Sequence, residues 1–221
     1  MTTDNHDRLL NPQVDKDHYY GKGYLTPRRF ASYGHQLQEI AALEPKNVLE
    51  VGVGNGVVPY MLRGAGFDVT TLDFDPALEP DVVASVTDMP FGDGAFDIVA
   101  CFEVLEHIPW DRMPQALGEI QRVCRRYALI SVPDAREYFL VHIPGLISRR
   151  LFKRPFWKPH KHQFDGEHYW EINTNSHSLN AFVERIKAAG FEMERTFRAW
   201  EMPEHRFFRL RAVAGPRQPI Q

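Results

Sequence analysis

A glycine-rich segment early in the chain combines residue types that suit the binding of a nucleotide-like ligand. Residues 48–56 read VLEVGVGNG, an apolar run followed by glycines at alternate positions. Glycines in such a loop let the backbone approach a ligand without Cβ clashes. Glu50 lies two residues before Gly52, a position that suits a ligand ammonium group and opposes a pyrophosphate. The spacing G-x-G-x-G also departs from the G-x-G-x-x-G of dinucleotide sites, whose third glycine would fall at Val57.

Three later segments carry acids and aromatic residues where strands are expected to end. They read TLDFDP over 71–76, VTDMPF over 86–91 and FDIVACFEVLEH over 96–107. Together with the glycine segment they resemble class I S-adenosylmethionine (SAM)-dependent methyltransferases, most closely the type 11 group of small-molecule and quinone methyltransferases. The resemblance is continuous over residues 45–133 and looser through the C-terminal helix and hairpin.

The resemblance implies SAM as the cofactor and S-adenosylhomocysteine as the product. In the family the glycine loop holds the methionine part of SAM, and Asp73 matches the acid that binds both ribose hydroxyls. Phe74 would lie against adenine, Asp88 would accept from the adenine amino group, Met89 would pack on the ring, and Phe102 would lie beside the sulfonium. The implied cofactor-binding residues are Glu50, Gly52, Gly54, Asn55, Gly56, Asp73, Phe74, Asp88, Met89 and Phe102.

Two other functions compete with methyl transfer. An NAD(P)-dependent oxidoreductase would also use a strand, a glycine loop and a helix, but Val57 and the position of Glu50 disfavour it. A protein that binds SAM without transferring its methyl group would keep Glu50, Asp73 and Asp88, and these residues do not by themselves establish catalysis.

Candidate catalytic groups follow the expected fourth strand. A hydroxyl acceptor benefits from a general base, and Glu103, His107 and His168 are the candidates for this role. Each also has a structural reading, in which His107 caps a turn or packs, Glu103 makes a structural hydrogen bond and His168 lies in a lid. We predict no metal site, because the spacing of His160 and His162 relative to His168 matches no standard zinc pattern.

A basic and aromatic stretch follows an apolar one between residues 139 and 161. Such a segment can lie on an anionic membrane surface, bind a substrate phosphate, stack on RNA bases, or be a solvated lid. We expect a small-molecule, glycan or lipid-linked acceptor, with peripheral membrane contact through 139–161 as one mode of docking. Tyr24 and Tyr33 would close over the site or simply pack. The candidate substrate-binding residues are Tyr24, Tyr33, Arg149, Arg150 and Trp157.

The elements that must position these groups alternate between strand and helix patterns. This alternation predicts an α/β fold: a doubly wound, mostly parallel Rossmann-like sheet with a C-terminal antiparallel hairpin and an inserted cap. The link after Asp73 has room for one helical turn at most, and 81–86 reads as a strand. The expected parts are a flexible arm (1–18), a lid and helix (19–44), a SAM-binding core (45–133), a cap (134–178) and a C-terminal helix with hairpin (179–221).

Composition sets broad limits on the function. The 221 residues carry a formal net charge of −3, and 43% of them are hydrophobic and 25% charged. These values fit a globular chain, and the near-neutral charge disfavours a dedicated nucleic-acid binder. A polar N-terminus, apolar runs too short to span a bilayer and two cysteines predict a cytoplasmic protein with free, buried thiols. The oligomeric state stays open.

Overall fold

A single mixed sheet forms the centre of the protein. The computed structural model describes residues 14–145, 147–153 and 158–213. Within these ranges seven strands pair in the order β3-β2-β1-β4-β5-β9-β8. The first five run parallel, and β9 pairs antiparallel with both β5 and β8. The strands are β1 (Asn47–Val51), β2 (Asp68–Asp73), β3 (Val82–Val83), β4 (Phe96–Phe102), β5 (Cys124–Pro133), β8 (Phe191–Arg198) and β9 (His205–Ala212).

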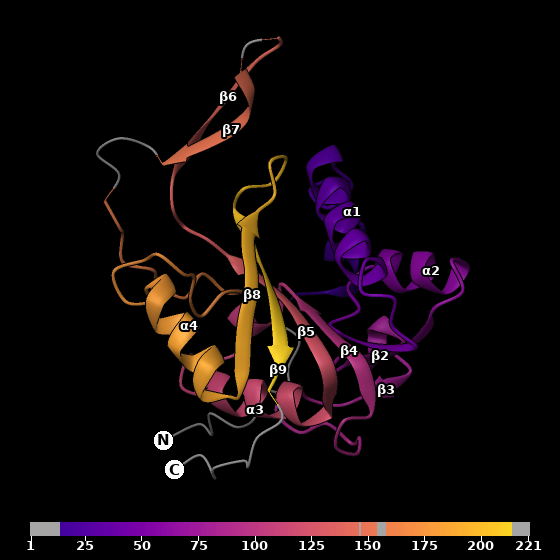
Figure 1. Cartoon of the computed structure of the whole chain (residues 1–221). Coiled ribbons are helices and arrows are strands. Elements are labelled where there is room, and N and C mark those ends of the chain that lie inside the picture. The colour runs from indigo at the N-terminus through magenta and orange to yellow at the C-terminus, as the bar shows by residue number, and fades with distance from the viewer. Residues whose placement is uncertain (1–13, 146, 154–157, 214–221) are drawn as a thin grey trace.

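Helices cover both faces of this sheet (Figure 1). Side chains of a strand alternate between faces, so Val48 packs toward α1 and α2 while Leu49 packs toward α3 and α4. Ile98 and Val99 of the neighbouring β4 divide in the same way. Two apolar clusters therefore enclose the sheet, as predicted for a doubly wound fold. The helices are α1 (Pro27–Ala41), α2 (Val57–Gly64), α3 (Met113–Val123) and α4 (Leu179–Ala188).

Local sequence explains where several elements begin and end. The Thr26 side chain accepts from the Arg29 amide and Pro27 occupies the first turn of α1, as predicted. Short 3-10 helices lie at Lys16–Tyr20 (η2), Pro76–Leu78 (η3) and Leu105–His107 (η4), and η3 is the single turn expected after β2. The strand predicted over 81–86 is wrong beyond Val83, because the chain turns where Ser85 bridges Asp88.

The cap predicted over 134–178 has two parts of different character. Strands β6 (Tyr138–Ile143) and β7 (Ile147–Lys153) form a hairpin that extends away from the sheet (Figure 1). The stretch 158–178 instead lies against the core, where Trp170 and Ile172 are fully buried. The amide of Tyr169 donates to the Glu106 carbonyl, which ties this stretch to η4. The expected irregular cap is thus a projecting hairpin followed by a packed segment.

Two further sequence expectations can be compared with the structure. Cys101 and Cys124 are free and buried, as predicted. Among the described helices, none has the length and apolar character needed to cross a bilayer.

Candidate functional site

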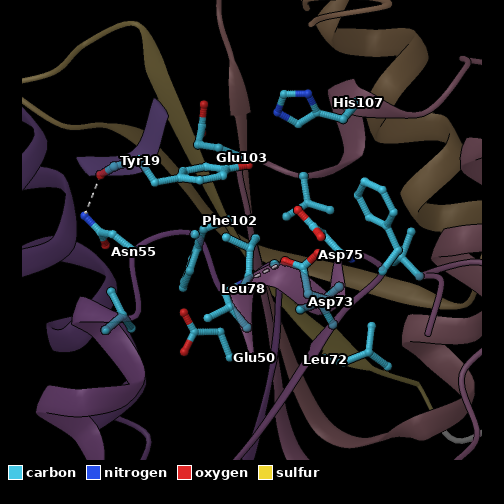
Figure 2. A pocket seen from close by; sticks show the side chains of 18 of the residues that line it. Tyr19, Glu50, Asn55, Leu72, Asp73, Asp75, Leu78, Phe102, Glu103 and His107 are labelled. Carbon is cyan, nitrogen blue, oxygen red and sulfur yellow. Dashed lines mark hydrogen bonds between the residues drawn. The ribbon is translucent and has the colours of Figure 1, made fainter. Parts of the chain in front are cut away.

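A pocket opens where β1, β2 and β4 end, at the carboxyl edge of the parallel strands. It is lined by the glycine loop, the turn after β2, the end of β4 and the N-terminal segment. Figure 2 shows Glu50 toward one end, Glu103 and His107 toward the other, and Phe102 between them. Parallel α/β sheets bind ligands at this edge, so the architecture places the site where the sequence predicted it.

The glycine loop forms one wall of the pocket. Gly52 has φ +87°, and a Cβ there would overlap Cγ2 of Val104. Its amide donates to the Leu72 carbonyl at 2.8 Å, which fixes the loop against β2. Gly54 (φ +55°) and Asn55 also line the pocket, and the Asn55 side-chain amide donates to the Tyr19 carbonyl (Figure 2). Gly56 caps α2 and lines an adjacent surface groove instead.

Glu50 presents an unpartnered carboxyl oxygen at the end of the pocket next to the glycine loop. The residue is 5% exposed, and Oε2 has no hydrogen-bond partner within the described ranges. Burial raises the pKa of this carboxyl well above its ordinary value, although Arg63 acts in the opposite direction. An orphaned, buried carboxyl beside a glycine cradle suits a ligand cation, because such a group would supply both charge and hydrogen bonds.

Asp73 links the glycine loop to the turn after β2. Its Oδ2 accepts from the Val53 amide at 2.9 Å and its Oδ1 from the Asp75 amide at 3.0 Å. Burial raises its pKa, and these backbone hydrogen bonds lower it. Each oxygen keeps a second lone pair, so the carboxylate can also accept from a ligand. Phe74 lines the pocket beside Asp73 and is partly exposed.

Asp88 and Met89 are not among the described residues that line the pocket, and their contact with adenine stays a prediction. The Asp88 amide donates to the Ser85 carbonyl at 3.0 Å, and this turn leaves the Asp88 side chain exposed. Met89 is 3% exposed within the core cluster. The same loop contributes Ala84, Ser85 and Val86 to the lining.

Phe102 and Glu103 occupy the end of β4, at the centre and the acceptor side of the pocket (Figure 2). Glu103 has φ +54°, an uncommon conformation for a side chain with a Cβ. Its Oε1 accepts from the Ser131 hydroxyl at 2.6 Å, and its Oε2 lies 3.4 Å from Nε2 of His205. Burial raises the pKa of Glu103 to about 7, so the carboxyl can gain or lose a proton near neutral pH.

His107 lines the pocket beside Glu103, whereas His168 lies behind it. The His107 Nδ1 lies 3.0 Å from the Glu167 carbonyl, which assigns the ring proton to Nδ1. Burial lowers the pKa of His107 to about 4. His168 packs edge-on against His107, with ring centroids 5.1 Å apart. Burial opposes its charged form, but a hydrogen bond with Glu171 leaves its pKa raised.

Glu106, His107 and His168 come together in a way that the sequence reading missed. Their ligand atoms all lie within 4.8 Å of one another, close enough to hold a cation. Glu106 is fully buried, and neither carboxyl oxygen has a hydrogen-bond partner from another described residue. Burial, followed by the nearby Glu103 carboxyl, raises the pKa of Glu106 well above its ordinary value. The histidines weighed for zinc are arranged differently, since His162 donates to the His168 carbonyl.

The N-terminal segment closes the remaining side of the pocket. Tyr24 and Tyr33 line it, as do Tyr19, Arg29 and Gln36, which the sequence reading did not select. The Arg29 guanidinium lies 4.4 Å from the Tyr24 ring centroid, and its Nε is buried without a described partner. Arg29, Tyr33 and Gln36 are spaced i, i+4 and i+7, so a shared face of α1 was the available signal.

Two of the remaining predicted substrate residues, Arg149 and Arg150, lie on β7 of the hairpin. Trp157 falls outside the described residues.

The order of the strands and the glycine cradle at their carboxyl edge define a class I SAM-dependent methyltransferase fold. A family described as methyltransferase domain matches residues 25–196. The chain belongs to this family, and the fold class and family predicted from the sequence are confirmed.

Similar proteins agree on the fold while differing in their named reactions. The ubiquinone biosynthesis O-methyltransferase of Bordetella avium is 34% identical, with 33% of this chain and 37% of that protein covered. The chain thus matches little more than a third of that curated relative's length. A Burkholderia thailandensis 1,6-didemethyltoxoflavin-N1-methyltransferase structure with bound S-adenosylhomocysteine has TM-score 0.61 and 18% identity, covering 94% of this chain and 89% of that one. Magnesium protoporphyrin IX methyltransferase from Synechocystis PCC 6803, with bound SAM, has TM-score 0.55 and 15% identity, covering 96% and 92%.

Proposed function

We propose that this protein transfers a methyl group from SAM to a hydroxyl oxygen of a small organic acceptor. The observation that carries the proposal is Glu103, a carboxyl with its pKa raised to about 7 that lines the same pocket as the unpartnered Glu50. A general base works best with a pKa near the working pH. An amine acceptor would need no such group, because its neutral form already offers a lone pair.

The cofactor end fits the two charges of the methionine part of SAM. The orphaned Glu50 oxygen would accept from its ammonium group, and the buried Arg29 Nε would donate to its carboxylate. Asp73 would accept from the ribose hydroxyls with its remaining lone pairs, and Phe74 and Leu78 would contact the adenine ring of SAM. Bound SAM supplies a methyl group on a sulfonium sulfur, already activated for displacement.

The acceptor end supplies a proton acceptor and an aromatic wall. Glu103 takes the hydroxyl proton as the oxygen–methyl bond forms and the sulfur–methyl bond breaks, so the carboxylate ends protonated. His107 is neutral near pH 7 because burial lowers its pKa to about 4, which makes it a weaker base and a hydrogen-bonding wall of the acceptor site. His168 packs against His107 and orients its ring.

The acceptor class is proposed from the hairpin. Strand β7 carries Arg149, Arg150 and Lys153, and Phe139 on β6 is 43% exposed. Basic residues next to exposed apolar ones suit a phosphate- or lipid-linked acceptor and peripheral contact with an anionic membrane. The ubiquinone-related name of the curated relatives is compatible with such an acceptor. Two free, buried cysteines support the cytoplasmic location that we propose.

The test compares wild type with Glu103→Gln in a methyl-transfer assay with radiolabelled SAM. Loss of a general base lowers a rate by about 10²–10⁴-fold, and we expect this loss in kcat while the SAM Kd stays unchanged in calorimetry. Full activity in Glu103→Gln would show that another group, or an amine acceptor, is responsible. If the wild type binds SAM but transfers no label to any fraction of a cell extract, the result would favour a SAM-binding protein without transfer activity.

A further inference from the structure

His205, at the first position of β9, lies behind Glu103 and was not selected from the sequence. The residue is 5% exposed, and Nε2 lies 3.4 Å from Glu103 Oε2. Its Nδ1 lies 3.2 Å from the hydroxyl of Ser32, a fully buried residue of α1. Three residues that are distant in sequence thus form a continuous row leading from α1 to the pocket.

When Glu103 is ionised, the row has one arrangement of protons that satisfies every group. Burial, together with the nearby Arg29 cation, lowers the pKa of His205 to about 3, so the ring is neutral and carries one N–H. With the proton on Nε2, the ring donates to Glu103 while Nδ1 accepts from the Ser32 hydroxyl. The opposite tautomer would place the Nε2 lone pair against a carboxylate oxygen, which is repulsive. The Glu103 carboxylate therefore selects this tautomer, and the Ser32 hydroxyl stabilises it by donating to Nδ1.

We infer that His205, oriented by Ser32, is a positioning residue that holds the Glu103 carboxylate in the geometry needed to accept a proton from the methyl acceptor. The inference rests on the proposed function of Glu103 as the base. The Ser131 hydroxyl binds Oε1 from β5 and His205 approaches Oε2 from β9. Each oxygen is held from a different strand, so the carboxylate cannot rotate freely and its remaining lone pairs stay directed into the pocket.

Other charged groups near Glu103 also affect its pKa. Arg29 from α1 and His168 from the packed segment stabilise its ionised form, and Glu171 of that segment opposes it. The Glu103 charge raises the pKa of the Glu106 carboxyl on η4, and it also raises the pKa of the Tyr24 hydroxyl. Because these groups remain when His205 is replaced, a change in Glu103 after that replacement reports on the His205 contact itself.

The experiment compares His205→Phe, His205→Gln and Ser32→Ala with wild type. Phenylalanine keeps the ring without a donor, and the glutamine amide can restore a donor near the Nε2 position. We expect His205→Phe to lower kcat about 10- to 100-fold with the acceptor KM and SAM Kd within about twofold. The acid limb of its pH–rate profile should move upward by about one pH unit, because the ionised carboxyl loses a donor. His205→Gln should recover most of the lost kcat, and the kcat of Ser32→Ala should lie between those of wild type and His205→Phe.

A matched control is His35→Gln. His35 lies on α1, as Ser32 does, but it pairs with Glu201 outside the pocket. This variant should leave kcat and the pH profile unchanged. A loss in His205→Phe that is equal at every pH, with no recovery in His205→Gln, would overturn the inference and leave His205 a packing residue. If His205→Phe does not fold, the pH–rate profiles of His205→Gln and Ser32→Ala are compared with that of wild type. A wild-type profile in both variants overturns the inference.

A second measurement separates this inference from the proposed function. The carboxyl ¹³C signal of Glu103, assigned by its disappearance in Glu103→Gln, reports its titration without any turnover. If Glu103→Gln retains activity, the base assignment fails and the positioning role fails with it, whereas an upward shift of the Glu103 titration in His205→Phe would still establish the contact. An unchanged titration in His205→Phe contradicts the inference even when Glu103 is the base.

Discussion

The two ends of the pocket are built in different ways. At the cofactor end, the glycine loop and the turn after β2 bond to each other directly, through Gly52 to Leu72 and Val53 to Asp73. At the acceptor end, Glu103 depends on side chains from β5 and β9, and the loop between β8 and β9 is tied to α1 by the Arg28–Glu204 pair. One end is a local backbone structure, and the other is an assembly of distant side chains.

This difference suggests which changes each end tolerates. A backbone cradle fails when a side chain is added, because its shape depends on glycine conformations. An assembly of side chains fails when a single donor or acceptor is removed, and it can be altered without disturbing the cofactor site. Substitutions at the two ends of the pocket can test that division.

Gly52→Ala should be the most damaging change. Its added Cβ would overlap the stiff Val104 side chain at a positive φ, and we expect the free energy of unfolding to fall by about 2–4 kcal/mol, with SAM affinity reduced as well. Gly56→Ala is the matched control, since its φ is also positive but open space surrounds it; it should lose only about 1 kcal/mol. Equal effects, measured by denaturant unfolding, would show that crowding by Val104 is unimportant.

Glu50→Gln should weaken SAM binding without unfolding the protein. Removing the charge from a buried acceptor of an ammonium hydrogen bond costs about 1.5–3 kcal/mol, which corresponds to roughly a 10- to 150-fold higher Kd. Asp88→Asn serves as the control, because Asp88 is exposed outside the pocket. Calorimetry should show no change for it; weaker binding there would instead support the adenine contact predicted from the sequence.

Glu106→Gln tests whether the buried carboxyl is neutral. Its pKa is raised in the folded state above the ordinary value of 4.5, so its contribution to stability is complete below that pH and is lost as the pH rises toward the folded pKa. The unfolding free energy of wild type should therefore fall by up to about 1.4 kcal/mol per pH unit in this range relative to Glu106→Gln. Parallel pH curves would mean that Glu106 is ionised in the folded protein. A rise in wild-type Tm on adding Mg²⁺ or Zn²⁺ that Glu106→Gln lacks would mean that Glu106 binds a cation.

Charge reversal on the hairpin should have the mildest effect. We expect the triple change Arg149→Glu, Arg150→Glu and Lys153→Glu on β7 to raise the acceptor KM several-fold, because these basic residues would no longer attract an anionic surface. SAM binding and unfolding should match wild type. An unchanged KM, with acceptor presented free or in anionic vesicles, would remove the hairpin from acceptor binding.

Sequence reading succeeded where function depends on local backbone. The glycine loop, the Thr26–Pro27 start of α1 and the short link after β2 all follow from residue type and spacing. It did not predict the turn held by Ser85, which leaves Asp88 exposed and places Met89 in the core.

The contacts that shape the acceptor end could not be derived from spacing. His205 reaches Glu103 only because β9 pairs with β5, and Ser32 reaches His205 only because α1 packs beside both. The pairing of Glu106 with His168 likewise requires the packed segment to return to η4. The β6–β7 hairpin was missed because its basic and aromatic residues carry no clean alternation of polar and apolar positions.

The central claim is that this pocket methylates a hydroxyl oxygen with Glu103 as the base. The most direct measurement is transfer from methyl-¹³C SAM into a cell extract of the source organism, with the product's methyl group assigned by NMR as bonded to oxygen or nitrogen. We expect an O-methyl product in the small-molecule or lipid fraction, formed by wild type and lost with Glu103→Gln. An N-methyl product, or an O-methyl product formed equally by both, would contradict it.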